Sequence, residues 1–493
     1  MNTPVLIVGA GPVGMTLASE LARYGIPVRI IDKAPHRTDK SKAMVIWSRT
    51  LELLDRGAGG AAPFVNAGFK IEGVAFMANE RVVGRVDMDS IPSLHNYALA
   101  LPQSETERLL EERLISQGVD VERQVEATMI TPDESGAHVD LVHPDGRKEA
   151  VRADWLIGCD GAHSTVRHAL SVPFAGETLL SDWFLADVHM SGYPRPDTDA
   201  SIYWHEEGVL LIFPIQAGRY RIIGDLPATQ DAVPPTPTLD QVQKLVDKRG
   251  PAGTELKDPI WLSGFRINGR KVSSYQQDHT FLAGDAAHIH SPAGGQGMNT
   301  GMQDAINLGW KLALVIRGDA HESLLDSYTP ERSAVGDSVL KAAERLTTVA
   351  TIRNPVAQRL RNLAGHFVLG LTHFTRGVAE TMSEVDIHYP DSPLNGPHQG
   401  GLVPGQRVAP VEGYPPAGSG QRPLFAVFGA LSSDVEQMVK RYPNLLEVNI
   451  RPPLQDNLIS LVRPDGYLAC SASATEDISA YLGRLSVPAK FSS

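Results

Sequence analysis

The sequence predicts an α/β protein with a parallel-sheet domain, an antiparallel sheet inserted into it, and a small α/β domain at the C-terminus. Three short apolar runs of strand length end at Gly9, Asp160 and Asp285, and each leads into a helical pattern. Between the second and the third, several strand-like segments are joined by turns. Because the carboxyl ends of strands in an open α/β sheet meet at one crevice, we expect a single ligand site at these three positions.

The first apolar run, 5–8, opens directly into GAGPVG. A helical pattern and a second apolar run then lead to Asp32, 18 positions after Gly14. This is the Rossmann-like dinucleotide-binding pattern in its full context. Gly9 makes the tight turn, Gly11 lets the backbone approach a pyrophosphate, and Gly14 lets helix and strand pack closely. Asp32 is expected to accept hydrogen bonds from ribose hydroxyls.

The loop that follows, 33–42, is basic. Lys33 and Lys42 either reach back to a ribose and pyrophosphate as point charges or lie on a solvated loop, and the residues leave both readings open. Gln103 stands just ahead of a helical segment at 105–116, where a surface position is the simpler expectation.

The most specific stretch runs from 281 to 310. A short strand ends in Gly-Asp285, a loop with Pro292 and four glycines follows, and a helical pattern comes after it. Such a loop brings backbone N–H groups and a helix N-terminus against an anionic or polar ligand. Asp285 is suited to accept hydrogen bonds from ligand hydroxyls. The alternative is a glycine-rich surface turn.

Composition excludes several classes of function. The 493 residues carry a net charge of -12, which argues against nucleic acid as a partner. Two cysteines form no disulfide framework, and no Cys/His cluster has metal-ligand spacing, so no metal is expected. The N-terminus lacks a basic signal region, and no apolar run is long enough to cross a bilayer. We therefore expect a cytoplasmic protein without a membrane span, with peripheral docking left open.

Strand-like segments between 201 and 223 indicate an antiparallel sheet within the insert, a natural wall for a second ligand. Ordinary packing is the alternative for each candidate side chain. The candidates to face a pocket are Tyr203, His205, Phe213 and Arg221.

Proline and glycine accumulate between 390 and 423, which predicts a linker or a surface loop. Strand-like and helical segments follow it to the C-terminus. The predicted domains are 1–175 together with 265–390 for the discontinuous first domain, 176–264 for the inserted sheet, 391–423 for the linker, and 424–493 for the last domain.

Together, GAGPVG with Asp32, CDGAHSTVR, and GDAAHIHSPAGGQGMNTGMQDAINLGWKLA resemble the FAD-dependent aromatic hydroxylases. These are single-component flavoprotein monooxygenases with the fold of para-hydroxybenzoate hydroxylase, and the similarity runs over roughly 4–390. The terminal segment with VRPDGYLAC resembles the thioredoxin-like C-terminal domain of the phenol and polyketide hydroxylase branch. It has no CxxC, so a redox role for it is not expected.

The resemblance implies a role for each position in binding FAD. The pyrophosphate side would involve Gly9, Gly11, Val13, Gly14, Lys33, Lys42 and Asp160, the last also near the nicotinamide-nucleotide path. The adenosine would meet Asp32 and the backbone near Val125, the ribityl chain Asp285, and the flavin side Gln103. The ring carbonyls would accept hydrogen bonds from the backbone of Gly295, Gly297, Met298 and Asn299. Family members often carry arginine where this chain has Lys42, so a bidentate phosphate contact there is in doubt.

The implied reaction uses NADPH or NADH to reduce FAD, and a flavin hydroperoxide then transfers one oxygen atom from O2 to an aromatic small molecule. Pro292 would lie beside the reactive edge of the flavin, and His205 or Arg221 would favour a substrate phenolate. The alternatives are an antibiotic-modifying enzyme of the rifampicin-hydroxylase type, a halogenase or reductase on the same scaffold, and a non-catalytic FAD-containing ligand-binding protein. A WxWxIP-like stretch of the halogenases is missing. Oligomeric state is open, with a homodimer as the state considered.

Overall fold

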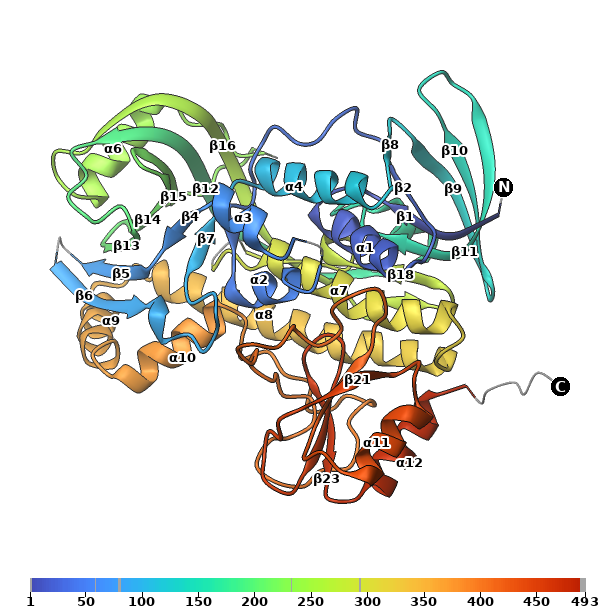
Figure 1. The fold of residues 1–493 in the computed structure, drawn as a ribbon. Coiled ribbons are helices and arrows are strands. Elements are labelled where there is room, and N and C mark those ends of the chain that lie inside the picture. Colours follow the sequence, from blue (N-terminus) through green and yellow to red (C-terminus); the bar gives the residue numbers. More distant parts are fainter. Residues whose placement is uncertain (1, 58, 79–80, 232, 292–293, 488–493) are drawn as a thin grey trace.

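The computed structural model describes residues 2–57, 59–78, 81–231, 233–291 and 294–487. Figure 1 shows a first sheet with helices α1 (Pro12–Arg23) and α4 (Gln103–Ser116) beside it, and a second sheet next to the first. The long helices α7 (Gly297–Ile316) and α8 (Tyr328–Ala350) lie between the first sheet and a C-terminal unit.

The first sheet is mainly parallel and carries the three predicted strand ends. β1 pairs in parallel with both β2 and β11, and β11 pairs in parallel with β18. Its strands are β1 (Asn2–Val8), β2 (Val28–Asp32), β8 (Val121–Arg123), β9 (Glu126–Asp133), β10 (Gly136–Val142), β11 (Lys148–Gly158), β17 (Gln276–Gln277) and β18 (Thr280–Leu282). The carboxyl ends of β1, β11 and β18 thus meet at one edge, which confirms the predicted arrangement.

Local sequence explains the beginning of the first sheet. Val5, Leu6 and Ile7 are fully buried, because β1 lies between two neighbouring strands and is covered by helices. Pro12 occupies the first turn of α1, where its missing N–H costs no hydrogen bond. A Cβ atom at Gly14 would lie 1.9 Å from the carbonyl oxygen of Gly9, so only glycine permits this helix to pack so close to the strand end.

The second sheet is mixed and larger than the predicted insert. Its order is β19-β16-β12-β15-β14-β13-β5-β6, antiparallel except for the β5–β13 pair. Its strands are β5 (Gly73–Ala78), β6 (Arg81–Asp87), β12 (Phe174–Ser191), β13 (Asp199–His205), β14 (Gly208–Gln216), β15 (Arg219–Leu226), β16 (Glu255–Val272) and β19 (His288–Ile289). The boundaries 176–264 therefore cover only the central part of this sheet, since β5 and β6 come from the preceding segment.

One helix and a small third sheet lie beside the two large sheets. Helix α6 (Leu239–Arg249) packs against β14 and β16 of the second sheet. A three-stranded sheet in the order β3-β7-β4 includes segment 44–47 through its strand β3. Its strands are β3 (Val45–Ile46), β7 (Ala98–Ala100) and β4 (Phe69–Ile71). The remaining short helices are α2 (Ser48–Leu54), α3 (Ala62–Ala67) and α5 (Thr165–Ala169), the last of which contacts β9 and β11 of the first sheet.

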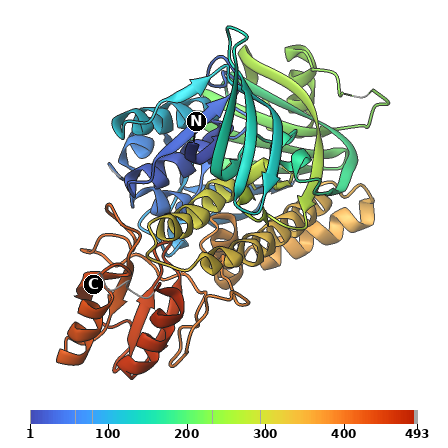
Figure 2. The ribbon, with the colours of Figure 1, turned by 90° about the vertical axis from the view of Figure 1, so that its right-hand side faces the viewer.

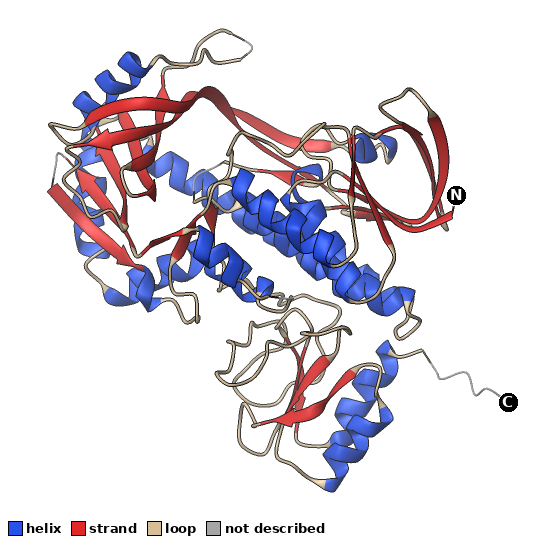
Figure 3. Cartoon of the chain, turned by 45° about the horizontal axis from the view of Figure 1, so that its top comes forward, coloured by secondary structure: helices blue, strands red, loops and turns tan. Residues whose placement is uncertain are grey.

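Helices α9 (Pro355–Val368) and α10 (Thr372–Met382) follow α8 and contact β6 at the edge of the second sheet. Figures 1 and 3 show them on the outside of the molecule, beyond the strands. They thus extend the helical part of the first domain over the wall that the second sheet provides.

The C-terminal unit is a four-stranded mixed sheet in the order β21-β20-β22-β23 with two helices. Its elements are β20 (Phe425–Phe428), α11 (Ser433–Arg441), β21 (Leu446–Arg451), β22 (Ile459–Val462), β23 (Leu468–Ala472) and α12 (Thr475–Leu485). This is the predicted small α/β domain, and Figure 2 shows it projecting from the body of the molecule.

The predicted linker 391–423 is packed on this unit and does not hang free. The N–H of Gly405 donates to the carbonyl of Leu468 at 2.8 Å, and the N–H of Val408 donates to Gly466 at 3.0 Å. Leu402, Val408 and Val411 pack against the apolar core of the unit. The proline and glycine content therefore reflects an irregular covering segment, since proline cannot donate to a sheet ladder.

Candidate cofactor and substrate site

The N-terminus of α1 faces open space at the end of β1. Gly9 has φ +103°, and a Cβ atom there would lie 2.4 Å from the carbonyl oxygen of Cys159. Gly11 is the N-cap of α1 and has no capping side chain, and a Cβ atom on it would meet nothing within 4 Å. The side chain of Val13 would contact a Cβ atom placed on Gly284, so Val13 packs between the first and third strand ends. An uncapped helix N-terminus with bare backbone beside it suits an anionic ligand.

Asp32 holds the glycine-rich turn in place. Its Oδ2 accepts a hydrogen bond from the N–H of Ala10 at 2.7 Å, and its Oδ1 accepts one from Ala34 at 2.8 Å. The N–H of Val125 donates to the backbone carbonyl of Asp32 at 3.0 Å, which brings the predicted adenine-side backbone next to this carboxylate. Each carboxylate oxygen retains a second lone pair for a ribose hydroxyl.

Gln103 fastens the basic loop to α4. Its Oε1 accepts from the N–H of Ala43 at 3.2 Å, and its Nε2 donates to Glu107 at 2.9 Å. Lys33 and Lys42 are both exposed on the loop itself. The structure therefore leaves the two ammonium groups accessible, while Gln103 is half-buried in a structural contact that the residues alone did not suggest.

Asp160 caps helix α5 with one oxygen and leaves the other without a partner. Its Oδ2 accepts from the N–H of Thr165 at 2.6 Å and of Val166 at 3.3 Å. Its Oδ1 is buried and has no hydrogen-bond partner among the described residues. Burial raises the pKa of Asp160 above its ordinary value, although the hydrogen bonds lower it in part. An orphaned buried oxygen at a strand end is the kind of atom that a bound nucleotide would satisfy.

Asp285 lies at the third strand end with an exposed carboxylate. The surrounding protein is nevertheless close enough that burial raises the pKa of Asp285, while the charges of His288 and Lys42 lower it in part. The preceding Gly284 has φ +60°, which turns the chain sharply after β18. The carboxylate is open to solvent, and protein atoms surround its base. A ligand hydroxyl could therefore reach it and donate a hydrogen bond.

The N-terminus of α7 completes the edge. Gly295 has φ +65°, and the helix begins at Gly297 with no capping side chain. The first-turn N–H groups of Gly297, Met298 and Asn299 cannot form bonds within the helix, so they are free to donate to a ligand. The Asn299 side chain is used internally, since its Oδ1 accepts from the N–H of Trp47 at 2.8 Å. Pro292, predicted beside the reactive centre, lies outside the described residues.

A buried group of charged side chains, which the sequence did not predict, packs behind the N-terminus of α7. Nε2 of His288 lies 2.7 Å from Oδ2 of Asp304, and Nε of Arg332 lies 2.6 Å from Oδ1. Arg332 also donates to the carbonyl of Thr300 at 3.0 Å. No spacing in the sequence could have found this group, because Arg332 comes from α8.

Arg221 and His205 do not converge on a pocket. Arg221 is buried and donates to Asp187 and to the backbone carbonyls of Ser41 and Lys42. His205 lies at the β13–β14 turn, where its Nδ1 accepts from the N–H of Glu207.

His205 and Arg221 pair with residues at different positions along β14. His205 pairs with Gly208 and Arg221 pairs with Phe213, a separation of five residues or roughly 17 Å. These positions do not support the predicted role of either residue in favouring a phenolate. A polar side chain on a strand can form hydrogen bonds within the fold or face a pocket, and the sequence alone does not distinguish these two roles.

An apolar cluster between the second sheet, segment 44–47 around β3, and α10 is the stronger candidate for a substrate wall. Several of its large side chains are only partly buried. They are Phe69, Phe76, Ile202, Phe213 and Met382. Of these, Phe213 was predicted to face a pocket, whereas Phe69, Phe76 and Met382 come from outside the predicted insert. The apolar run at 73–78 is the signal that could have identified β5.

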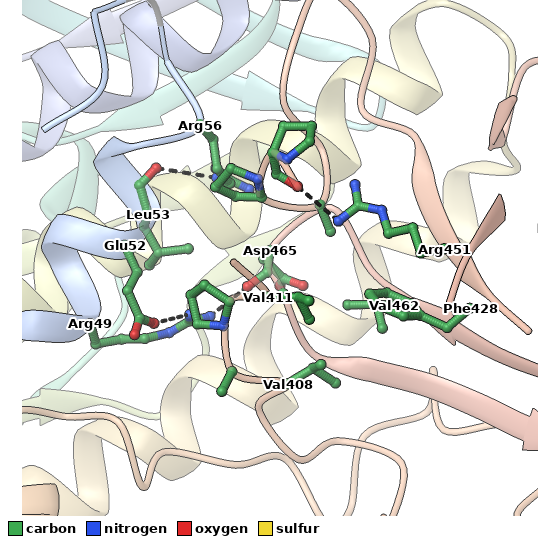
Figure 4. Close-up of a pocket in the computed structure, with 16 residues that line it drawn as sticks. Arg49, Glu52, Leu53, Arg56, Val408, Val411, Phe428, Arg451, Val462 and Asp465 are labelled. Atoms are coloured by element: carbon green, nitrogen blue, oxygen red, sulfur yellow. Dashed lines mark hydrogen bonds and ion pairs between the residues drawn. The ribbon is translucent and has the colours of Figure 1, made fainter. Parts of the chain in front are cut away.

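A separate cavity of about 40 Å³ lies at the junction between α2 and the C-terminal unit (Figure 4). Three arginines line it, and each donates at least one hydrogen bond within the protein, although Nε of Arg49 is buried without a partner among the described residues. Arg49 donates to Glu52, Arg56 donates to the carbonyl of Pro464, and Arg451 donates to the carbonyl of Pro415. The cavity has room for a few water molecules and is not a cofactor site.

Among the described residues, no α-helix has both the length and the apolar character needed to span a bilayer. Within the same residues, no group of three or more His, Cys, Asp or Glu side chains is arranged to hold a metal ion.

Comparison with known proteins identifies the family. The model of the FAD binding domain matches residues 2–343. A 6-methylpretetramide 4-monooxygenase from Streptomyces rimosus is 34% identical over 98% of this chain and 93% of its own length. A rifampicin monooxygenase from Streptomyces venezuelae is 34% identical over 78% of this chain and 79% of its own.

The fold comparison agrees. The solved structure of an anhydrotetracycline hydroxylase from Streptomyces rimosus superposes with a TM-score of 0.80 at 28% identity, covering 99% of this chain and 100% of the other. The strand ends, the uncapped helix N-termini and the orphaned oxygen of Asp160 fit the binding of FAD. The chain therefore belongs to the FAD-dependent aromatic hydroxylases, a family of flavoprotein monooxygenases.

Proposed function

We propose that this enzyme hydroxylates a fused-ring aromatic substrate of the polyketide type, with NADPH or NADH as reductant and O2 as oxygen donor. The observation that carries the substrate class is the full-length similarity to 6-methylpretetramide 4-monooxygenase and to anhydrotetracycline hydroxylase, which extends through the C-terminal unit. The wide apolar cluster between the second sheet and α10 supports it, because flat ring systems bind by apolar contact.

In this proposal FAD lies along the edge formed by the three strand ends. Asp32 holds the adenosine ribose and the N-terminus of α1 the pyrophosphate, with Lys33 and Lys42 adding positive charge. Asp285 accepts from the ribityl hydroxyls, and the first-turn N–H groups of α7 donate to the ring carbonyls. What supports these roles is the exposure of Asp285 and the missing caps on both helices.

FAD, when bound, supplies the electron transfer and the activation of O2. The protein contributes position, charge and exclusion of water. The N-terminus of α7 places partial positive charge where negative charge develops on the ring. The apolar side chains around Phe76 and Phe213 would exclude water and offer apolar contact to a substrate ring.

The reductant would bind only transiently. The chain has one glycine-rich turn in the full dinucleotide-binding context, at Gly9–Gly14, and FAD takes it. The exposed Lys33 and Lys42 and the partly buried Asp160 are the charged groups proposed to meet the reductant. The two buried free cysteines fit a reducing cytoplasm as the location.

Hydroxylation of a rifampicin-type antibiotic is the second candidate activity, because a rifampicin monooxygenase is also similar to this chain. The similarity to rifampicin monooxygenase covers a smaller share of the chain, 78% against 98% for the pretetramide enzyme. A binding protein that keeps FAD without turnover is the non-enzymatic alternative, and it would show no ligand-dependent consumption of NADPH.

The experiment is a panel of phenols, hydroxybenzoates, anthraquinones, anhydrotetracyclines and rifamycins, tested with the FAD-loaded protein for stimulated oxidation of NADPH and of NADH. Product masses separate oxygen insertion from uncoupled turnover. We expect the largest stimulation, with a product heavier by one oxygen, for a fused-ring compound. Stimulation confined to rifamycins or to single-ring phenols would contradict the substrate class.

A further inference from the structure

An open recess lies where α1 and α7 both end, beside the segment that enters the C-terminal unit. Its volume is about 420 Å³. Three arginines line it, Arg23, Arg317 and Arg422, and none of its described lining residues is acidic. A protein whose net charge is -12 thus has a basic recess at this junction.

Arg23 serves the fold and has no donor left for a ligand. A guanidinium has five N–H donors. Those of Arg23 all have acceptors within the chain, which are the carboxylate of Glu20, the hydroxyl of Tyr24, and the carbonyls of Gly418 and Gly420. Arg23 therefore contributes positive charge to the recess and no hydrogen bond.

Arg317 and Arg422 have unused donors. Nε of Arg317 donates to Asp319 and its Nη1 donates to the carbonyl of Tyr24, both at 3.2 Å. Nη2 of Arg422 donates to Asp319 and to Asn444, both at 3.1 Å. Three N–H groups of each guanidinium have no acceptor among the described residues, and Nε of Arg422 is buried. A buried donor normally has a partner, so the unused Nε indicates that a ligand or water completes this site.

The charges around the recess are not balanced within the chain. Asp319, whose side chain is 8% exposed, is shared by the two guanidinium groups just described. Glu20 is likewise shared by Arg23 and Arg56. In the described part of the chain these four arginines form no other ion pair, so two positive charges are left without a counter-charge. An anion in the recess would supply it.

We propose that the recess binds a phosphate dianion, either as free phosphate or as the phosphate group of a small ester. Arginine binds phosphate oxygens through paired hydrogen bonds, and Arg317 and Arg422 both offer such pairs. Tyr24, the aromatic residue of the lining, is fully buried and has Arg23 over its ring at 4.0 Å. No ring face is therefore open for a nucleotide base to stack on, which favours a small phosphate over NADPH or NADH.

The recess is separate from the proposed FAD site. The 12 residues of α1 span roughly 18 Å, so the recess lies a helix length away from the turn proposed to hold the pyrophosphate. Residues 421 and 422 lie just before β20 of the C-terminal unit. A phosphate held between Arg317 and Arg422 would therefore join the FAD-binding domain to this unit and stabilise their junction.

The first test is calorimetric titration of the full-length FAD-loaded protein with inorganic phosphate at constant ionic strength. We expect saturable binding with a dissociation constant of about 1 mM or lower. Arg317→Gln and Arg422→Gln should each weaken it at least about 10-fold. Asp319 keeps one guanidinium partner in either variant, so neither leaves a carboxylate unpaired. The matched control is Arg441→Gln, the same charge change at an exposed position on α11, which should bind phosphate as wild type does.

The second test is the melting temperature of the FAD-loaded protein. Phosphate should raise it by about 1–3 °C more than chloride does at the same ionic strength, over the concentrations at which it binds. The rise should be smaller in Arg422→Gln and unchanged in Arg441→Gln. Arg422→Lys keeps the charge but loses the paired donors, so its rise should fall between these two.

Further titrations identify the form of the ligand. Glycerol 3-phosphate that binds as well as phosphate would assign the recess to a phosphate ester, and binding at least about 10-fold weaker would assign it to free phosphate. Succinate that binds more tightly than either would overturn the phosphate class.

Three other results would overturn the proposal. The first is a wild-type protein that shows no saturable binding of phosphate and no stabilisation beyond that of chloride. The second is equal affinity in wild type, Arg317→Gln and Arg422→Gln, which would place the anion elsewhere. The third is phosphate binding that releases FAD, measured as loss of flavin absorbance after filtration, because phosphate would then occupy the cofactor site.

Discussion

The guanidinium of Arg221 and the carboxylate of Asp187 form a buried ion pair, with Nε 2.7 Å from Oδ1. The same guanidinium donates to the carbonyls of Ser41 and Lys42. These bonds link β15 of the second sheet to loop 33–42, which carries Lys33 and Lys42. Arg221 positions that loop and is not available as a substrate-binding group.

Replacing Arg221 with methionine should lower the free energy of unfolding by about 3–5 kcal/mol, because it leaves the Asp187 carboxylate buried without its partner. Denaturant unfolding of the FAD-free protein measures this. Arg147→Met is the control, since Arg147 is 57% exposed and 3.9 Å from Glu149, and such surface pairs contribute about 0–1 kcal/mol. Equal stability of the two variants would remove the structural role given to Arg221.

Asp285→Asn should weaken FAD binding without weakening the protein. Loss of a charged acceptor reduces affinity by about 10- to 100-fold, measured by fluorescence titration of the FAD-free protein. The pKa of Asp285 is raised, and because its carboxylate is exposed to solvent, the ionised form destabilises the fold only slightly at pH values above that pKa. The FAD-free variant should therefore melt at the same temperature as wild type or higher at pH 7, and the difference should shrink on acidification.

The control for this variant is Asp231→Asn on an exposed loop. It should change neither FAD affinity nor melting temperature. If Asp285→Asn binds FAD as tightly as wild type, the ribityl assignment is excluded.

Glu384 introduces a pH dependence of stability. It accepts from Oγ1 of Thr300 at 2.7 Å and from Nε2 of Gln303, both on α7, and burial raises its pKa from 4.5 to about 8. Between these values the folded state holds a proton that the unfolded state has released, so stability falls as pH rises, by up to about 1.4 kcal/mol per pH unit.

Glu384→Gln removes the titrating group and should flatten this slope between pH 5 and 8. Melting temperatures of the FAD-free proteins over that range measure it, with Glu177→Gln at an exposed position as the control. A wild-type slope that persists unchanged in Glu384→Gln would show that Glu384 is ionised in the folded protein.

The C-terminal unit is joined to the body by buried charges. Arg463 bonds both oxygens of Glu331 at 2.6 and 2.9 Å, and Oδ2 of Asp465 accepts from Trp310 at 3.1 Å. Lys311 also lies 2.7 Å from Glu331, and burial lowers the pKa of Lys311 to about 8.

Truncation after Pro390 should therefore yield little soluble, FAD-loaded protein, because these groups lose their partners or their cover. Arg463→Met should destabilise by about 3–5 kcal/mol, whereas Arg441→Met on the outer face of α11 should have little effect. A truncated chain that binds FAD and melts as wild type would show that the junction contributes nothing to folding.

The sequence predicted the parts of this molecule that depend on local chemistry. The glycines at 9, 11 and 14, Asp32 and Asp285 could be placed because a strand, a tight turn and a helix follow one another along the chain. The pairing of β5 and β6 with the second sheet could not be predicted, because β5 pairs with β13, more than 100 positions away in the sequence. The structural use of Arg221 was hidden for the same reason, because its partners come from distant segments.

The most direct test of the proposed activity is oxygen incorporation from isotopically labelled O2. The FAD-loaded protein is incubated with NADPH, labelled O2 in ordinary water, and the fused-ring compound that most stimulates NADPH oxidation. We expect a product that carries one labelled oxygen atom per molecule, formed only when reductant and substrate are both present. NADPH consumption that yields only peroxide, or a product whose new oxygen comes from water, would contradict the assignment as a hydroxylase of fused-ring aromatic compounds.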